Sequence, residues 1–261
     1  DGLVAYLNFD EGAGNTSADR SGNGRSLRIE GGTEWIPAGI RGSALRLDGN
    51  NANAYIPEGG APLWNNATMS ASIWFRLSGG ATRLNFLSGV RLDGDDCYGM
   101  SLEFFGVSGM FAAISPGGAN AGLVGCSPNQ QRAGECTSLR DGEWHHIVYV
   151  RDRGNMIVYL DGMRGAGSGI NGRSPSEAVG NFHLGGPLDA RCGGMGRMDG
   201  APAIVDDLHI YNRALSQEEV DGIRAQFVQD PNASTIGSTA NSNVVTLTQL
   251  DNGFDGNTEI S

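Results

Sequence analysis

The chain contains no lysine. All 18 of its positive charges are arginines, against 29 aspartates and glutamates, so the net charge is −11. An acidic surface repels the phosphates of nucleic acids and of anionic membranes. We therefore expect neither nucleic acid nor an anionic membrane surface among its partners.

Long hydrophobic runs are also missing. No stretch approaches the roughly 18 consecutive apolar residues that a membrane-spanning helix needs, so we expect no membrane insertion. The first residues show no signal-peptide pattern, and we expect the chain as given to be a processed product or an excised domain. Hydrophobic residues make up 39% of the sequence, which is enough for a sizeable core.

Cysteine and histidine are scarce, with four of each, and no C-x-x-C pair occurs, which argues against a zinc cage. An even number of cysteines in a glycine-rich, extracellular-looking chain favours two disulfides, for which three connectivities are open. Cys126 and Cys136 lie ten positions apart in a polar loop that is easily closed. We therefore predict a Cys126–Cys136 bridge, which leaves Cys97–Cys192 as the second.

Glycine is abundant instead, with 42 residues in turn-like clusters between short apolar runs. This spacing is typical of many short strands joined by turns. The stretch 69–77 shows the alternation well, with Ile73 and Phe75 on one face and Trp74 on the other. The strands that we expect cover residues 2–9, 27–29, 35–36, 44–47, 69–77, 86–92, 98–105, 110–114, 144–151, 156–160, 182–184 and 204–211.

One short helix is predicted at residues 217–227, after the last of these strands. Ser216 stands three residues before Glu219, the spacing of a capping box in which each side chain bonds the other residue's amide. Leu215 and Val220 flank this box at the two positions of a hydrophobic staple. The segment thus specifies a strand, a turn and a capped helix.

The composition changes after Phe227. Residues 228–261 are rich in Ser, Thr, Asn, Asp and Gly and hold one strand-like run, 243–250. We predict one domain over residues 1–227 and a polar tail, or a linker to another domain, over 228–261.

Three stretches carry a resemblance to a known family. They are Gly2–Gly14 with Asp19-Arg-Ser-Gly-Asn-Gly24, then Asp141–Arg151 with Val158-Tyr-Leu-Asp-Gly162, and finally Val205–Val220. Together they resemble the laminin G-like, concanavalin A-like jelly-roll family, in its bacterial, pentraxin-related branch. The resemblance implies an all-β, two-sheet antiparallel jelly-roll sandwich, here with one short C-terminal helix and an extended tail.

Catalysis is not expected. Related jelly-roll glycanases carry an E-x-D-x-x-E triplet on one strand, and no such triplet occurs here. Asp206 and Asp207 are adjacent, so on a regular strand they would point to opposite faces. We expect His145 and His146, one facing in and one out, to serve packing. The chain is therefore predicted not to be an enzyme.

A structural calcium ion is predicted from oxygen-bearing side chains. Asp10, Asp19 and Asn23 lie near the first strand in and beside a glycine-rich loop, and Asp206 lies on the last strand. Calcium needs six to eight oxygen ligands and tolerates irregular geometry. The resemblance implies that the Asp19–Gly24 loop and Asp206 form the two halves of the site. The alternative is that Asp19 and Asn23 only cap turns.

Carbohydrate recognition needs an aromatic platform with polar groups beside it. Trp64 and Tyr98 are candidate platforms, although an aromatic residue also serves core packing. Asp93, Asp95 and Asp96 are candidate acceptors for sugar hydroxyls, and the alternative is a solvated turn.

These observations predict a secreted, extracellular or cell-surface binding domain that recognises a glycan or another cell-surface polymer in a lectin-like or adhesive role. The alternative is a structural subunit of a surface assembly, in which the 243–250 strand self-assembles with a neighbouring copy or an adjoining domain by strand addition. An enzyme with an atypical site is a third hypothesis.

Overall fold

The computed structural model describes residues 2–49, 52–57, 68–77, 83–93, 96–105, 110–115, 119–125, 139–153, 155–165, 168–169, 182–185, 199–200 and 202–227. Contacts divide the chain into two units, Asp1–Val228 and Gln229–Ser261. The second unit, with the predicted strand 243–250, lies outside the described residues.

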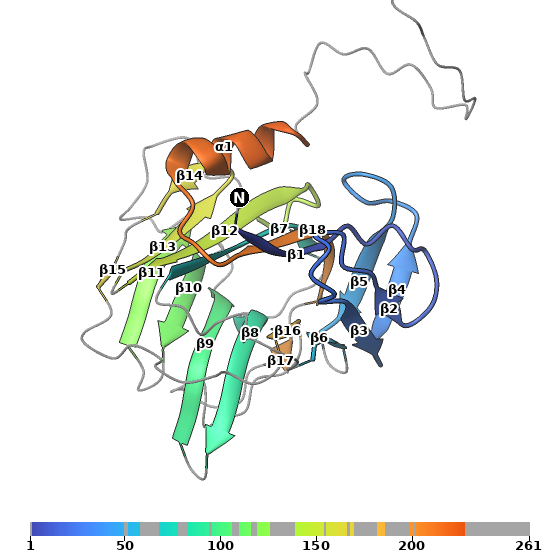
Figure 1. The fold of residues 1–261 in the computed structure, drawn as a ribbon, viewed down its shortest axis with the longest axis horizontal. Helices are drawn as coiled ribbons and strands as arrows, with labels where there is room; N and C mark the ends of the chain where they lie inside the picture. The colour runs from blue at the N-terminus through green and yellow to red at the C-terminus, as the bar shows by residue number, and fades with distance from the viewer. Residues whose placement is uncertain are drawn as a thin grey trace, which may run out of the picture. The chain divides into compact units, whose positions relative to one another are not determined.

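The first unit consists of two sheets, sheet A and sheet B (Figure 1). Sheet A contains β1 (Leu3–Leu7), β4 (Thr33–Ile36), β5 (Ala44–Asp48), β7 (Thr68–Leu77), β12 (His145–Asp152), β13 (Asn155–Leu160), β14 (Met163–Arg164), β15 (Ser168–Gly169) and β18 (Pro202–Tyr211). Sheet B contains β2 (Thr16–Ser17), β3 (Leu27–Glu30), β6 (Asn53–Ile56), β8 (Arg83–Asp93), β9 (Asp96–Phe105), β10 (Met110–Ser115), β11 (Ala119–Gly125), β16 (Phe182–Leu184) and β17 (Asp199–Gly200).

The strand order shows why distant parts of the sequence meet. Sheet A runs β14-β13-β12-β7-β18-β5-β4, with β1 on β18, and sheet B runs β11-β10-β9-β8-β16-β6-β3-β2. Every described pairing is antiparallel except that of β17 with β8. The predicted antiparallel sandwich is confirmed, and the described residues hold one short helix near their end.

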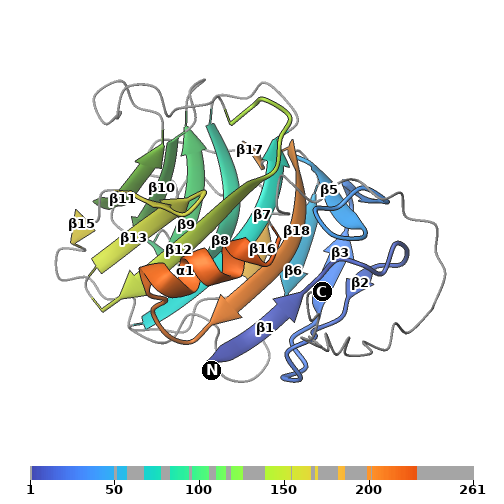
Figure 2. The same ribbon diagram turned by 90° about the horizontal axis from the view of Figure 1, so that it is seen from above.

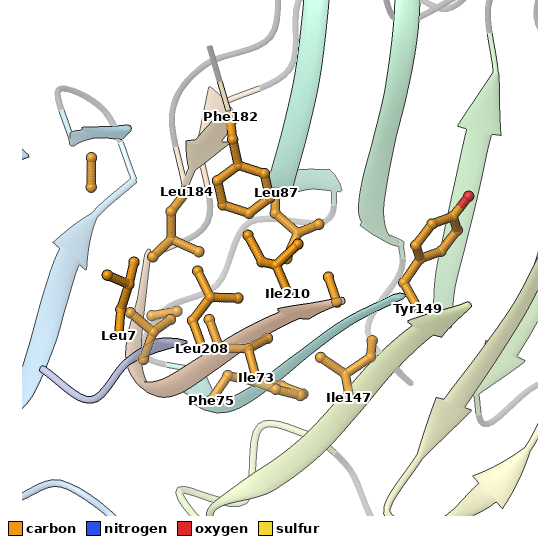
Figure 3. Close-up of a cluster of buried hydrophobic side chains, with 14 of the residues drawn as sticks. Leu7, Ile73, Phe75, Leu87, Ile147, Tyr149, Phe182, Leu184, Leu208 and Ile210 are labelled. Carbon is orange, nitrogen blue, oxygen red and sulfur yellow. The ribbon is translucent and has the colours of Figure 1, made fainter. Parts of the chain in front are cut away.

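The core lies between the inner faces of the two sheets (Figure 3). Sheet A contributes every second residue of β7, including Ile73 and Phe75, while sheet B contributes Leu87, Phe182 and Leu184. The predicted division of β7 is therefore confirmed, because Trp74 lies on the other face, where it stacks on His146.

Helix α1 (Gln217–Ala225) lies on the outer face of sheet A, across β12, β7 and β18 (Figure 2). Both hydrogen bonds of the predicted capping box are present, between Ser216 and Glu219. Leu215 and Val220 are buried in one cluster with Val148, which confirms the predicted staple. In the described part of the chain, this helix is too short and polar to cross a membrane.

Candidate functional site

Two of the predicted metal ligands meet at one loop, residues 39–43, which leads into β5. Asp10 Oδ1 accepts a hydrogen bond from the Ser43 amide at 3.0 Å. Asp206 Oδ2 accepts one from the Arg41 amide at 3.3 Å. The two carboxylates, 196 positions apart in the sequence, therefore anchor the same short loop, Asp10 from the segment after β1 and Asp206 from β18.

Asp206 and Asp207 do not point to opposite faces, so that expectation was wrong. Asp207 has a positive φ of 48°, and the β18–β7 register shifts between Asp206 and His209. The bulge adds one residue to the outer face, because Val205 and Leu208 both remain in the core.

The two neighbouring carboxyls are buried on that outer face. Burial raises the pKa of Asp206 to about 8, and the charge of Asp207 adds to the rise against opposing amide hydrogen bonds. Burial likewise raises the pKa of Asp207 to about 6, although the Tyr6 hydroxyl, 2.7 Å away, and the Arg41 charge oppose it. Paired buried acids of this kind favour a nearby cation.

Carbonyl oxygens complete the surroundings of Asp206. A β-carbon added to Gly39 would lie closer than 3.0 Å to Asp206 Oδ2, to the Ser43 carbonyl and to the Arg41 carbonyl. These three oxygens thus converge on one side of the Gly39 backbone. Among the described residues, no three Asp, Glu, His or Cys side chains form a metal-holding group. A cation here would depend on these carbonyls, which calcium accepts as ligands.

Asp19 and Asn23 have other partners. The Asp19 carboxylate accepts hydrogen bonds from the amides of Tyr6, Ser21 and Arg25 at 2.8–3.0 Å, and from the Ser21 hydroxyl. Burial alone would raise the pKa of Asp19, but these bonds outweigh it and lower the pKa. The Asn23 amide donates to the Leu3 carbonyl and the Ser21 hydroxyl. This arrangement supports the turn-capping alternative for both residues.

The predicted sugar-binding residues are placed only in part. Asp93 and Asp96 pair at the end of the β8–β9 hairpin, and Tyr98 lies opposite Arg91, but only the backbone is described there. Trp64 and Asp95 lie outside the described residues. So do Cys126, Cys136 and Cys192, and for Cys97 only the backbone is described, so the disulfides stay a prediction.

A polar cluster on the outer face of sheet B was not predicted from the sequence. It consists of Glu30 on β3, Asn53 and Tyr55 on β6, and His183 on β16, and we call it the Tyr55–His183 cluster. Tyr55 is opposite His183 in the strand register, and their rings stack with centroids 5.6 Å apart. Strands β6 and β16 lie inside the sheet, not at its edge.

Three hydrogen bonds connect the cluster. The Tyr55 hydroxyl donates to Glu30 Oε1 at 2.8 Å, and Asn53 Nδ2 donates to Glu30 Oε2 at 3.1 Å. His183 Nδ1 lies 3.2 Å from Asn53 Oδ1. Burial lowers the pKa of His183, so the imidazole is neutral at pH 7. A half-buried aromatic pair is thus framed by an amide and a carboxylate.

The other histidines serve packing. His145 lies against Phe75 of the core and His146 against Trp74 on the outer face, which confirms that one points in and one out. His146 also contacts the Ser72 hydroxyl at 2.8 Å, but burial lowers its pKa to about 3. A buried imidazole of this kind has no access to a substrate.

His145 lies between two carboxylates, with Nδ1 2.8 Å from Asp161 and Nε2 3.2 Å from Asp141. Burial lowers its pKa, but these hydrogen bonds and charges outweigh burial and raise the pKa above the usual 6.5. The interaction therefore stabilises the fold fully below the unfolded pKa, and this stability is lost as pH rises through the folded pKa.

Asp161→Asn should expose this dependence. Asparagine tolerates the positive φ of 51° at this position, and its carbonyl keeps the bond from the His146 amide. At pH 6 the His145 imidazolium is paired with Asp161, so we expect the variant to lose about 1–2 kcal/mol of unfolding free energy. Above the folded pKa of His145 this loss should become smaller. Urea denaturation at pH 6 and pH 9 measures the difference, and an equal loss at both values would contradict it.

Comparison with known proteins gives one family. The model of the concanavalin A-like lectin/glucanases superfamily matches residues 48–221. A search of curated protein sequences gave no match.

Solved structures share the fold. The binding domain of Paraclostridial mosquitocidal protein 1 has a TM-score of 0.61 at 18% identity, covering 87% of this chain and 52% of that chain. Domain 4 of AbnA, an extracellular GH43 arabinanase from Geobacillus stearothermophilus, in complex with arabinotriose, has a TM-score of 0.60 at 20% identity, covering 85% and 98%. Trypanosoma rangeli sialidase in complex with sialic acid has a TM-score of 0.62 at 17% identity, covering 87% and 33%. This chain therefore spans about half the length of the mosquitocidal domain.

Proposed function

Because the chain belongs to the concanavalin A-like lectin/glucanase superfamily, we propose that it is a non-catalytic binding domain that recognises carbohydrate through the Tyr55–His183 cluster. The observation that carries the proposal is a stacked aromatic pair, partly exposed on a sheet face, with a carboxylate and an amide bonded beside it. Sugars present apolar ring faces and hydroxyl edges, and such a surface complements both.

Similar structures support a carbohydrate ligand. The arabinanase domain was solved with arabinotriose, and the similarity covers 98% of that domain. The proposal also places the domain outside the cell, where glycan polymers are accessible. The arabinanase is itself an extracellular protein, which agrees with this placement.

We further propose a structural calcium ion at the 39–43 loop. Asp10 and Asp206 would hold it together with the carbonyl oxygens of Arg41 and Ser43. Support comes from the oxygens gathered around Gly39 and from the raised pKa of a buried carboxyl at that point. When bound, the ion would supply only positive charge that fixes the loop.

Glycan-array binding followed by calorimetry tests the function. Tyr55→Ala removes the aromatic platform and should weaken binding about tenfold or more. Met163→Ala is the matched control, because Met163 is 48% exposed and lies in sheet A. Loss of binding in both variants, or in neither, would count against the cluster. Release of reducing ends by the wild-type domain would overturn the non-catalytic assignment.

A further inference from the structure

The hydrogen bonds of the Tyr55–His183 cluster have only one consistent direction. A glutamate carboxylate accepts and does not donate at neutral pH, so the bonds to both Glu30 oxygens must come from the Tyr55 hydroxyl and from Asn53 Nδ2. With its amide nitrogen turned to Glu30, Asn53 presents its oxygen to His183.

This direction fixes the tautomer of His183. Since Asn53 Oδ1 can only accept, His183 Nδ1 must carry the proton. The ring is neutral because burial lowers its pKa, so Nε2 carries a lone pair. Within the described residues, no hydrogen bond to Nε2 is made.

Most hydrogen-bond donors of the cluster are therefore used within the cluster. Most of the groups that remain available to a ligand are acceptors. Both proton donors that face Glu30 are already used, and the Nδ1 proton is used by Asn53. What remains for a ligand is the lone pairs of Glu30, of the Tyr55 oxygen and of His183 Nε2, with one N–H of Asn53. Groups that complement such a surface are hydroxyls that donate.

We propose that the ligand is a neutral sugar that stacks on Tyr55 and donates its hydroxyls to Glu30 and His183 Nε2, and that acidic sugars are rejected. This rests on the proposed function and names its ligand class. A carboxylate or sulfate cannot donate, and it would face the Glu30 charge and an unpaired imidazole nitrogen. Because Glu30 is exposed, the discrimination comes from charge repulsion and from the lack of a donor opposite its oxygens, not from a buried group that loses its partner.

Arg28 is a cation beside the cluster, and it provides an internal control. It lies opposite Tyr55 on β3, exposed, so that Tyr55 stands between Arg28 and His183. An acidic ligand would have to use a cation such as Arg28, whereas a neutral ligand bound to the acceptors would not.

Calorimetric titration with neutral arabino- and xylo-oligosaccharides, and with oligogalacturonate and sialyllactose, tests the ligand class. We expect neutral oligosaccharides to bind at least about tenfold tighter than acidic ones. Glu30→Gln should weaken neutral binding about tenfold, since an amide places N–H groups where acceptors are needed. Arg28→Gln keeps a polar side chain beside Tyr55 and removes only the charge, so it should weaken neutral binding by less than Glu30→Gln does.

The possible outcomes distinguish the proposed ligand class from the proposed carbohydrate function. Tighter binding of acidic sugars that is lost in Arg28→Gln would overturn the ligand class and keep the carbohydrate function. No binding in either class would overturn both. Nitrogen NMR of the ligand-free domain gives a readout independent of any sugar: the Nδ1–H tautomer of His183 is expected in the wild type, and the Nε2–H tautomer would refute the proposal.

Discussion

Replacing Gly39 with alanine should destabilise the domain strongly, although the change adds only one methyl group. The new β-carbon would lie closer than 3.0 Å to two backbone carbonyl oxygens, of Arg41 and Ser43, and to the buried carboxylate of Asp206. Backbone oxygens held in a short loop cannot rotate away as a side chain can. We expect a loss of about 2–3 kcal/mol, the upper part of the range for overpacking.

Thermal unfolding measures the effect. At about 2–4 °C per kcal/mol for a domain of this size, the melting temperature should fall by roughly 5–10 °C. Gly222→Ala is the matched control, since Gly222 is exposed inside helix α1 with nothing within 4 Å of an added β-carbon. That change should stabilise by about 0.5–1 kcal/mol. If the two alanine variants change the melting temperature alike, the predicted crowding around Gly39 in the 39–43 loop is wrong.

The parts of the fold that follow from local pattern could be predicted from the sequence. In β7, strict alternation places Ile73 and Phe75 in the core, and the spacing of Ser216 and Glu219 defines the helix start. Strand β11 was missed because Ala119–Gly125 is dominated by glycine and alanine, which have little preference for strands. It is a strand because β10 pairs with it along its length.

The bulge at Asp207 is visible in the spacing of the apolar residues of β18, although a regular strand was predicted there. Val205 and Leu208 are both in the core although three positions separate them, whereas a regular strand spaces core residues by two. That odd spacing indicates an inserted residue, and it explains why two adjacent aspartates share one face.

The Tyr55–His183 cluster could not be predicted, because its members meet only through sheet topology. Asn53 and His183 are 130 positions apart. They become neighbours because β16 inserts between β8 and β6, a crossover that no local pattern specifies. The sequence before Asn53–Ile56 is also rich in asparagine, a residue depleted in strands, so the strand itself was not predicted.

Calcium should raise the stability of the wild-type domain, and Asp206→Asn should remove most of that gain. A ligand that binds only the native state stabilises it by about 2.7 kcal/mol at 100 times its dissociation constant, or roughly 5–10 °C in melting temperature for a domain of this size. Asparagine keeps the shape of Asp206 but lacks the charge that would hold a divalent ion. The experiment compares melting in calcium and in chelator, for each protein.

Asp19→Asn is the control that distinguishes a ligand from a loop anchor. The Asp19 carboxylate of the wild type already accepts hydrogen bonds from three backbone amides, so Asp19→Asn should be destabilised equally in calcium and in chelator. A wild-type melting temperature that calcium leaves unchanged would refute the ion. A calcium shift that survives in Asp206→Asn but disappears in Asp19→Asn would instead move the site to the glycine-rich loop, where the sequence predicts Asp19 and Asn23 as ligands. The two variants therefore decide which of the two loops binds the ion, because each removes one carboxylate charge and leaves the other in place.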